Sequence, residues 1–461
     1  MLSRDRPLVL PVRDPSDSVG LRLMTDDCKS PNSPPTSFKG DTGKGLPGEG
    51  GEETVQDGMF ASLQHRNYRI FFFAQLVSLT GTWMQMVAEG WLVYSLTRSP
   101  MSLGIVRFLH TLPVTLLTFL GGSMADRYDK RTLLVVTQCL ALVFSLILYF
   151  LSLSESITFW QIGCLAVCLG ISNAIDIPVR QSFVVDMVGK EHLPNAIALN
   201  SSVFNAARIV GPAIAGLLVS RVSLPICFLI NAFSYGAVIA GYLCMRLPVR
   251  QSVSNVSHTR PLLRQAVQWI GGHPEVRTIF LLVSVASLFC MSYLVLMPVF
   301  VQERLHVGAE GLGWLLTANG VGAITGSVSL AWLRERGDRL QLSHWGLGIF
   351  LCASFCFAWT THSLLAGFLL AISGWGMIVF FATSNTMVQG FVPDGMRGRV
   401  MGVYAFCFIG LSPVGHFLAG WLAKVISAPF AVSLGSMVGV VALFLARNLS
   451  SASKRDVASK P

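Results

Sequence analysis

Five side chains that carry a charge or bind a proton lie within long apolar stretches of this sequence: Glu89, Arg107, His110, Asp176 and Arg208. Carboxylate and imidazole groups exchange protons, and a guanidinium group pairs with carboxylates and other anions. In a bilayer such groups are costly, so they usually face a cavity or one another and mark substrate or proton pathways. Their presence favours binding and proton transfer inside a membrane.

Glu89 lies in the outer half of its stretch, and Arg107 and His110, one helical turn apart, are expected at a similar depth. The Glu89 carboxyl group is either a protonatable coupling site or the structural partner of Arg107. Arg208 either attracts an anionic substrate or fixes a helix contact, and the adjacent Gly-Pro pair favours the contact.

Two other candidates have simpler explanations. Asp176 precedes Arg180 by one helical turn and could simply pair with it. His416, in a later apolar stretch, is as consistent with a packing residue as with a proton carrier.

The composition is that of a membrane protein. Of 461 residues, 52% are hydrophobic and 13% are charged, against about 25% charged in ordinary soluble domains. A run of about 18 or more apolar residues crosses a bilayer core as a helix. We therefore predict an all-α protein with twelve spans, near residues 69–96, 101–124, 132–153, 157–178, 195–219, 224–245, 276–300, 311–333, 343–361, 363–388, 399–423 and 428–446.

These spans divide the chain into parts. Residues 1–58 are rich in Asp, Ser, Pro and Gly and are expected to form a disordered cytoplasmic tail. Six spans fall in residues 59–246 and six in residues 276–447, joined by a linker at 247–275. Residues 448–461 are expected to be a second cytoplasmic tail.

The basic residues predict the orientation. Outside the first tail, 21 Lys and Arg side chains fall on one side of the predicted membrane, and only Arg98, Arg221, Arg304 and Lys424 fall on the other. Short loops rich in Lys and Arg remain cytoplasmic, so we expect both termini inside a bacterial inner (plasma) membrane. The net charge of +10 comes from these basic residues. Because they are dispersed over short loops, they do not indicate a nucleic-acid partner.

Several chemistries are disfavoured. Nine of the ten cysteines lie in predicted spans, without nearby His or carboxylate groups that would complete a metal site. No GxxxxGK[ST] phosphate loop occurs, so an ATP-driven pump is not indicated. No cofactor is expected. An intramembrane enzyme or a receptor scaffold is the alternative class, but no pair of catalytic groups stands out at one depth.

The chain also contains an internal repeat. Leu103-Gly104 resembles Leu312-Gly313 at an offset of 209, which places DRYDK (126–130) over ERGDR (335–339) with the same sequence of charges. QSFVVD (181–186) resembles QGFVPD (389–394), and GPAIAG (211–216) resembles GHFLAG (415–420) in the spacing of its glycines. The three resemblances occur in the same order in both parts of the chain, so they predict two related six-helix halves.

The sequence resembles the major facilitator superfamily. The resemblance is carried by two six-span halves and by Gly122-x3-Asp126-Arg127-x-x-Lys130-Arg131 between the second and third spans, although Asp129 stands where that motif has a glycine. The segments 178–218 and 392–423 resemble the branch that includes the enterobactin exporter and bacterial drug-efflux proteins.

The resemblance implies a gate on the cytoplasmic side. In the outward-facing state, Asp126 would face the start of the eleventh span, and Lys130 and Arg131 would anchor topology. The candidate gating residues are Gly122, Asp126, Arg127, Lys130, Arg131, Glu335, Arg336, Asp338, Arg339, Arg397 and Arg399.

The fifth span resembles the antiporter motif of this superfamily. Gly211, Pro212 and Gly216 would form a bendable, leak-free seam between the halves, or else an ordinary kinked helix. Helices that line the cavity in this superfamily add Gln85, Asn173, Asn385 and Gln389 as candidates for the substrate or proton pathway.

Together these features favour a monomeric secondary transporter in the lipid bilayer. It is expected to export a small amphiphilic molecule, drug-like or a siderophore, by alternating access, with protons as the counter-transported ion. Uptake of a small metabolite is the alternative, because the fold itself has no preferred direction.

Overall fold

The computed structural model describes residues 60–189, 191–246, 259–333 and 338–458, and these form helices joined by short loops, without a strand among them. The chain divides into two units, Met1–Gln56 and Asp57–Pro461, and every described residue belongs to the second. The tail expected at residues 1–58, and the gating candidates Glu335 and Arg336, lie outside the described residues.

The first half follows the predicted spans closely. After the short η1 (Ala61–Gln64) come α1 (Arg66–Thr97), α2 (Pro100–Arg127), α3 (Lys130–Leu153), α4 (Phe159–Val188), α5 (Leu193–Arg221) and α6 (Leu224–Cys244). Local signals set several boundaries. The Asp129 side chain caps α3 by accepting from the backbone N–H of Thr132, and Thr158 forms a capping box with Gln161 at the start of α4.

The second half is less regular. It consists of α7 (Thr259–Gly272), α8 (Pro274–Val285), η2 (Ala286–Cys290), η3 (Met291–Leu294), α9 (Met297–Val299), η4 (Phe300–Leu305), α10 (Gly308–Leu333), α11 (Arg339–Trp359), α12 (Ser363–Phe391), η5 (Asp394–Met396), α13 (Arg397–Ala405), η6 (Phe406–Gly410), α14 (Ser412–Val425) and α15 (Ala428–Ala458). Thus α7 lies within the predicted linker, and α15 continues into the predicted second tail.

The expected count of twelve spans is not confirmed. In the described part of the chain, ten helices are long and apolar enough to cross a membrane, or eleven if the sharply bent α7–α8 pair is counted. Around the predicted span at 276–300, the structure has a run of short helical segments. The predicted span at 311–333 is the 26-residue α10, which lies outside the ten because Asn, Gly, Ser and Thr residues lower its hydropathy.

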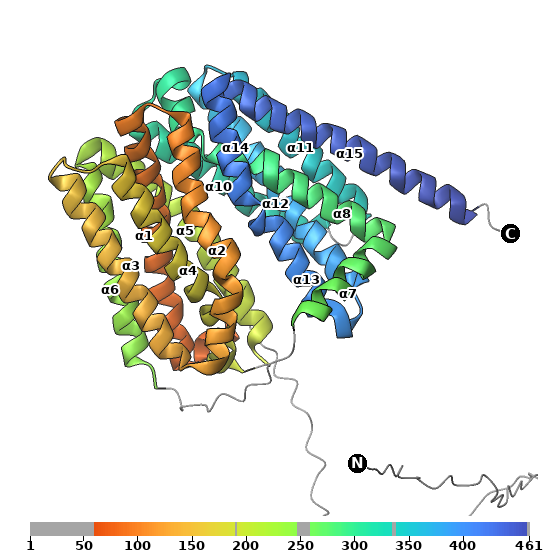
Figure 1. Ribbon diagram of the computed structural model, residues 1–461, viewed down its shortest axis with the longest axis horizontal. Helices are drawn as coiled ribbons and strands as arrows, with labels where there is room; N and C mark the ends of the chain where they lie inside the picture. The colour runs from red at the N-terminus through yellow and green to blue at the C-terminus, as the bar shows by residue number, and fades with distance from the viewer. Residues whose placement is uncertain (1–59, 190, 247–258, 334–337, 459–461) are drawn as a thin grey trace, which may run out of the picture. The chain divides into compact units, whose positions relative to one another are not determined.

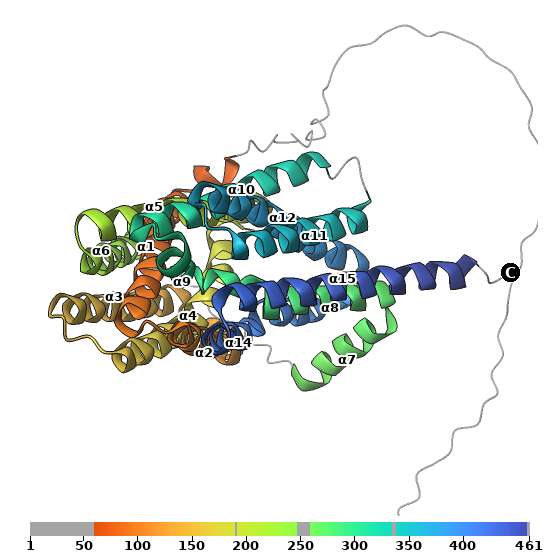
Figure 2. The ribbon, with the colours of Figure 1, turned by 90° about the horizontal axis from the view of Figure 1, so that it is seen from above.

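The two halves repeat one packing pattern, as the internal repeat predicts. Helix α2 packs on α4 as α10 packs on α12, and α3 packs on α6 as α11 packs on α15. Figure 1 shows α1–α6 on the left and α8, α11, α12, α13 and α15 on the right. Seen from above in Figure 2, the short α9 lies beside α1 of the first half. The all-α fold of two related helical bundles is confirmed.

Two helix pairs join the halves: α2 with α14 and α5 with α10. We call the end of the bundle at Asp126–Arg131 the basic end, and the end at Arg98–Pro100 the opposite end. In Figure 1 the halves come together toward the opposite end, at the top, and diverge toward the basic end, where α1 begins.

Glycines make the closest approaches between the halves. A Cβ atom added to Gly104 would lie 3.0 Å from the Cα of Gly420, and one added to Gly216 would lie 2.9 Å from the Cα of Gly313. All four glycines lie in the segments that resemble each other between the two halves. Glycines of the internal repeat therefore contact one another across the interface. Small residues permit such close helix contacts in membranes. We call these two contacts the glycine seams.

Candidate functional site

A cavity of about 330 Å³ lies between the halves. The first half contributes α1, α2 and α5 to its wall, and the second half contributes residues 291–298, α10, η6 and α14. Five of the sequence candidates line it: Glu89, Arg107, His110, Arg208 and His416. The apolar stretches thus bring most of the predicted charged groups to one place.

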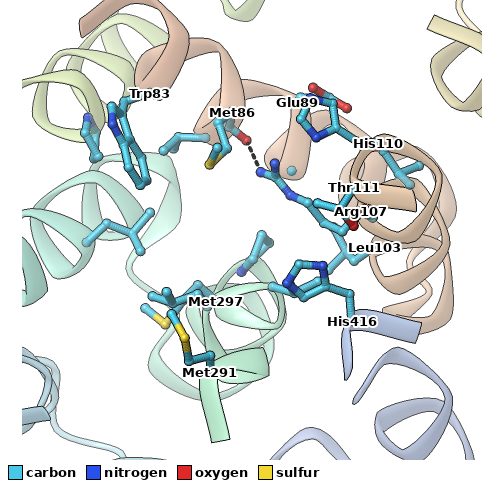
Figure 3. Close-up of a pocket in the computed structure, with 18 of the residues that line it drawn as sticks. Trp83, Met86, Glu89, Leu103, Arg107, His110, Thr111, Met291, Met297 and His416 are labelled. Atoms are coloured by element: carbon cyan, nitrogen blue, oxygen red, sulfur yellow. Dashed lines mark hydrogen bonds between the residues drawn. The ribbon is translucent and has the colours of Figure 1, made fainter. Parts of the chain in front are cut away.

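Glu89 is the acidic group of this cavity. Its side chain is 7% exposed and, within the described residues, has neither a hydrogen bond nor an ion pair. Arg107 stands beside it in the wall (Figure 3), but its Nη2 donates to the carbonyl oxygen of Met86 at 2.9 Å instead. The ion pair considered between Glu89 and Arg107 is therefore not formed in this conformation, and the carboxyl group is left for a proton or a ligand.

Two histidines from opposite halves stand near Arg107. His110 on α2 and His416 on α14 both line the cavity with Arg107 (Figure 3). His110 Nε2 lies 3.3 Å from the amide nitrogen of Asn173. The Nδ1 atoms of both histidines are buried and have no hydrogen-bond partner in the part of the chain that the structure describes. A buried ring nitrogen without a partner is a candidate position for water, a proton or a bound molecule.

Arg208 connects the halves across the α5–α10 interface. Its Nη2 donates to the side-chain oxygen of Asn319 on α10 at 2.7 Å. The Asn319 amide nitrogen donates in turn to the Tyr293 hydroxyl at 2.8 Å and to the Leu370 carbonyl at 3.1 Å. This geometry matches the helix contact considered for Arg208, which also lines the cavity.

Asn319 was missed by the sequence reading. It carries the same kind of signal as the residues that were selected, namely an uncharged polar side chain in the middle of a predicted span. It is 1% exposed and lines the cavity.

The remaining wall is apolar and rich in sulfur and aromatic groups. Trp83 and Met86 lie on the first-half side, and Met291 and Met297 lie across from them (Figure 3). Methionine side chains adapt their shape and contact aromatic rings favourably. The cavity thus combines an adaptable apolar surface with a few charged groups, as small-molecule sites do.

Asp176 lies elsewhere, inside the first half. Its carboxylate accepts from Thr137 at 3.0 Å and from Gln138 at 2.8 Å, and it pairs with Arg180 at 3.5 Å. It does not line the cavity. These three partners fit the simple pairing considered for it.

The other polar candidates also lie away from the cavity wall. Gln85 accepts from Ser145 and Asn231 inside the first half, both at 2.7 Å. Asn385 accepts from Gln389, which is exposed at the end of α12. Gln85 thus joins α1 to α3 and α6, whereas the Asn385–Gln389 bond lies within α12. Asn173 does not line the cavity, but it contacts His110, which does.

The gating candidates of the first half are bonded within that half or exposed. Lys130 pairs with Asp186 at 2.7 Å, and Arg131 donates to the Leu243 carbonyl at 2.6 Å. Asp126 and Arg127 are exposed and have no hydrogen bond or ion pair within the described ranges. Gly122 meets no atom within 4 Å of an added Cβ.

Their counterparts in the second half are also engaged locally. Asp338 caps α11, the helix that begins at Arg339, just as Asp129 caps α3. Arg397 pairs with Asp394 at 2.7 Å, and Arg399 donates to Gln265 at 2.9 Å. The gate expected between Asp126 and the start of α13 is not formed here, where the halves diverge.

The packing motif of α5 lies at the interface. Gly211 fits against α1, where an added Cβ would lie 2.6 Å from the Cβ of Trp83. Pro212 lines the cavity, and Gly216 forms one glycine seam. In the described part of the chain, no group of three or more His, Cys, Asp and Glu side chains is placed to hold a metal ion.

Comparison with known proteins agrees with this architecture. Residues 57–460 match the family model described as transmembrane secretion effector. The chain is 26% identical to the staphyloferrin A transporter of Staphylococcus aureus, over 77% of this chain and 89% of that protein. It is 26% identical to the multidrug efflux pump Tap of Mycolicibacterium fortuitum (85% and 98%) and 24% identical to the enterobactin exporter EntS of Shigella flexneri (82% and 90%).

Solved structures share the fold at low sequence identity. A bacterial homologue of the iron transporter ferroportin, in an inward-facing state, aligns with a TM-score of 0.65 at 15% identity, over 84% of this chain and 99% of that one. The nucleoside transporter NupG aligns with a TM-score of 0.67 at 10% identity, over 83% and 98%.

Proposed function

The chain belongs to the transmembrane secretion effector family of the major facilitator superfamily, and on this premise we propose that it exports a small amphiphilic molecule in exchange for protons. The substrate would be a drug-like compound or a siderophore, carried by alternating access. The observation that carries the proposal is the cavity between the halves. Its apolar, methionine-rich wall holds the buried Glu89 carboxyl group, which has no partner among the described residues.

The orientation follows from charge. We place the basic end in the cytoplasm, with both termini, because short loops rich in Lys and Arg remain there. The contacts between the halves lie from the middle of the spans to the opposite end, at the glycine seams and at the Arg208–Asn319 bond. The conformation described would then be inward-facing, ready to load substrate from the cytoplasm of a bacterial cell. The transporter would act as a monomer in the inner membrane.

Proton coupling is assigned to Glu89. A coupling carboxyl group must exist in both the charged and the neutral form during the cycle, which requires that no fixed partner hold one of them. Glu89 meets this requirement, whereas Asp176 is held by three partners. His110 and His416 are the next carriers to consider, since each has an unpaired ring nitrogen.

The substrate class rests on the cavity wall and on relatives. The relatives include a transporter of staphyloferrin A, an exporter of enterobactin and a multidrug efflux pump. The cavity volume of about 330 Å³ is at the small end of the range for drug-sized ligands, roughly 300–1,000 Å³.

The test uses purified protein in liposomes with an acidic interior. Staphyloferrin A, enterobactin and ethidium are added outside in turn, and the internal pH is followed with a trapped dye. Antiport predicts that a substrate accumulates inside while the interior loses protons. Downhill movement without proton exchange would refute coupling. In matched liposomes with an alkaline interior, accumulation of substrate together with proton entry would establish uptake by symport instead.

A further inference from the structure

The charged side chains of the cavity wall all come from the first half. They are Glu89 on α1, Arg107 on α2 and Arg208 on α5. Among the described residues, the second half adds no Lys, Arg, Asp or Glu to this wall. The wall therefore carries two guanidinium groups and one carboxyl group, so one positive charge has no counter-charge.

Arg208 is the group without a counter-charge. Arg107 has the Glu89 carboxyl group beside it in the wall (Figure 3). Arg208 is half-buried and forms no ion pair within the ranges that the structure describes. A charge at membrane depth is costly unless it is paired or faces a polar cavity. Arg208 therefore offers a place for an anion that the described part of the chain does not supply.

Arg208 and Glu89 lie at different depths. Helices α1 and α5 both start at the basic end, and Gly211 of α5 packs against Trp83 of α1. Arg208 precedes Gly211 by three residues, and Glu89 follows Trp83 by six. The two charged groups are therefore about nine residues, or about 13 Å, apart along the helix axes. An anion at Arg208 would bind nearer the basic end, apart from the carboxyl group to which proton coupling is assigned.

The second half holds the Arg208 guanidinium group in place. The Asn319 side chain accepts from Arg208 Nη2 and donates in turn to Tyr293 and Leu370. Of the five N–H donors of an arginine, the described residues accept from one here. The fork of the remaining donors matches a carboxylate, which accepts two of them at once. The bond to Asn319 thus orients the guanidinium group and leaves it able to bind an anion.

The surface next to Arg208 is apolar. Pro212 follows it by one turn of α5 and lines the cavity. Leu316 precedes Asn319 by about one turn of α10 and also lines the cavity. A charged group within an apolar wall suits a small molecule with an apolar body better than a free inorganic ion.

We propose that Arg208 binds a carboxylate or a similar anionic oxygen group of the transported molecule. The inference rests on the proposed export and adds the class of substrate, an amphiphilic anion, and the residue that selects it. Asn319 acts as a positioning residue for Arg208.

The first experiment compares three probes of similar shape: naphthylacetate, its uncharged amide naphthylacetamide, and naphthylethylammonium. Isothermal titration calorimetry of the purified full-length chain measures Kd for each. Wild type should bind the acetate about tenfold more tightly than the amide, because hydrogen bonds to a charged acceptor are the stronger kind. The cation should bind most weakly. Equal affinity of wild type for the acetate and the amide would overturn the inference.

Variants of Arg208 locate the preference. In Arg208→Gln the acetate should bind no better than the amide, with the Kd of the amide unchanged. Arg208→Lys keeps the charge without the fork, so part of the preference should return. The preference is a ratio within one variant, so a smaller folded fraction does not change it. A preference that survives in Arg208→Gln would overturn the inference.

The other charged residues of the wall provide matched controls. Arg107→Gln and Glu89→Gln should both keep the preference for the acetate, because the anion is expected at Arg208. Thr317→Val should also keep it, since this change removes another bond of the α5–α10 interface but no charge. An equal loss in Arg107→Gln would show that the net charge of the cavity selects the anion. A gain of acetate affinity of about tenfold in Glu89→Gln would place the anion beside Glu89. Either result would overturn the inference.

Two further measurements define the ligand and separate this inference from the proposed function. Chloride and inorganic phosphate are titrated alone, and binding as tight as that of the acetate would overturn the amphiphilic class. The three probes are then tested in the liposomes with an acidic interior, with protein-free liposomes as the blank. Proton exchange for the amide or the cation, but not for the acetate, would uphold proton-coupled export and overturn the inference. Acetate binding that depends on Arg208, with no proton exchange, would support the inference and refute the coupling.

Discussion

At the scale of single residues, the titratable groups of the cavity differ from Asp176 and Gln85 in how they are bonded. Inside the first half, Asp176 and Gln85 have two or more partners each. In the cavity, Glu89 has none among the described residues, and the two histidines each have an unpaired nitrogen. A group without fixed partners is free to change its protonation state or its ligand during a cycle.

Glu89→Gln tests this directly, because glutamine keeps the size of the side chain but binds no proton. We expect the variant to lose accumulation driven by a pH gradient and to keep downhill exchange of substrate, both measured in liposomes. Asp176→Asn is the comparison and should mainly lower thermal stability, because it weakens a bonded network. If Glu89 were only a structural partner of Arg107, Glu89→Gln would lower abundance, and adding Arg107→Gln would restore it.

The Arg208–Asn319 bond makes a second residue-scale prediction. Asn319→Ala leaves a half-buried guanidinium group without its acceptor in the other half, which should cost about 1.5–3 kcal/mol. Thermal unfolding in detergent measures this loss. Thr317→Val is the matched control, since the Thr317 hydroxyl also bonds across this interface, to the Ile209 carbonyl at 3.1 Å, but carries no charge. Equal losses in both variants would show that the charge of Arg208 is not what matters.

At the scale of elements, the regular helices could be predicted and the irregular segment could not. Hydropathy located all six spans of the first half, because every one is a long apolar run bounded by polar residues or proline. In residues 286–305 the apolar residues are equally dense, so composition gives no sign of a π- or 3-10 turn. Pro298 is the one local hint. The turns depend on partners distant in sequence, such as the Phe408 carbonyl, which hydropathy cannot pair with Ser287.

For the candidate site, too, some features could be predicted from the sequence and others could not. Charged residues within apolar stretches are conspicuous in a sequence, so Glu89, Arg107, His110 and Arg208 could be selected, and the structure places all four at the cavity. Which of them pair with one another could not be read, because pairing depends on helix rotation and on the approach of the second half. Asn319 was passed over because the amide candidates were taken from the first, fourth and tenth predicted spans, and Asn319 lies in the eighth.

The glycine seams predict how the elements tolerate change. In Gly216→Ala, the new Cβ would lie 2.9 Å from the Cα of Gly313, so α5 and α10 must separate. We expect a loss of about 1–3 kcal/mol, as for other overpacked contacts, together with greater access to the cavity from the opposite end. Gly236→Ala is the control, because its new Cβ meets only a Leu142 side-chain atom at 3.9 Å. Thermal unfolding and maleimide labelling measure the two effects, and similar behaviour of both variants would exclude a special role for the seam.

At the scale of the whole molecule, transport requires that the two ends open alternately. In the described conformation the contacts between the halves lie from the middle of the spans to the opposite end. Asp126 at the basic end is exposed and has no partner among the residues that the structure describes. This is what the proposed cytoplasmic gate would look like when open. Residues 126–130 and 335–339 carry charges in the same order of sign. The structure gives a reason for part of this likeness besides the proposed gate, because Asp129 and Asp338 cap the helices that follow them.

Asp126→Asn should therefore leave abundance unchanged and reduce transport. A contact between a charge and a helix end contributes about 0.3–2 kcal/mol, so its loss should shift the balance toward the inward-facing state severalfold. Labelling of a cysteine at Leu294 from the basic end would measure the shift. Asp129→Ala is the contrast: it removes a helix cap, so it should cost stability of about 0.5–2 kcal/mol instead. Normal transport by Asp126→Asn at wild-type abundance would refute the gate.

The glycine seams also bear on how the chain is assembled. Each bundle has its own interior contacts, and the two meet through α2 with α14 and α5 with α10, so recognition between them is a property of complementary surfaces and needs no tether. A gene split within residues 247–258 should therefore yield two fragments that insert separately, copurify and restore transport together. The same fragments carrying Gly104→Val and Gly216→Val should insert but fail to copurify, whereas the unsplit chain with these changes would still hold its halves at high effective concentration. The two bundles would then behave as two subunits of a complex that are encoded in a single chain.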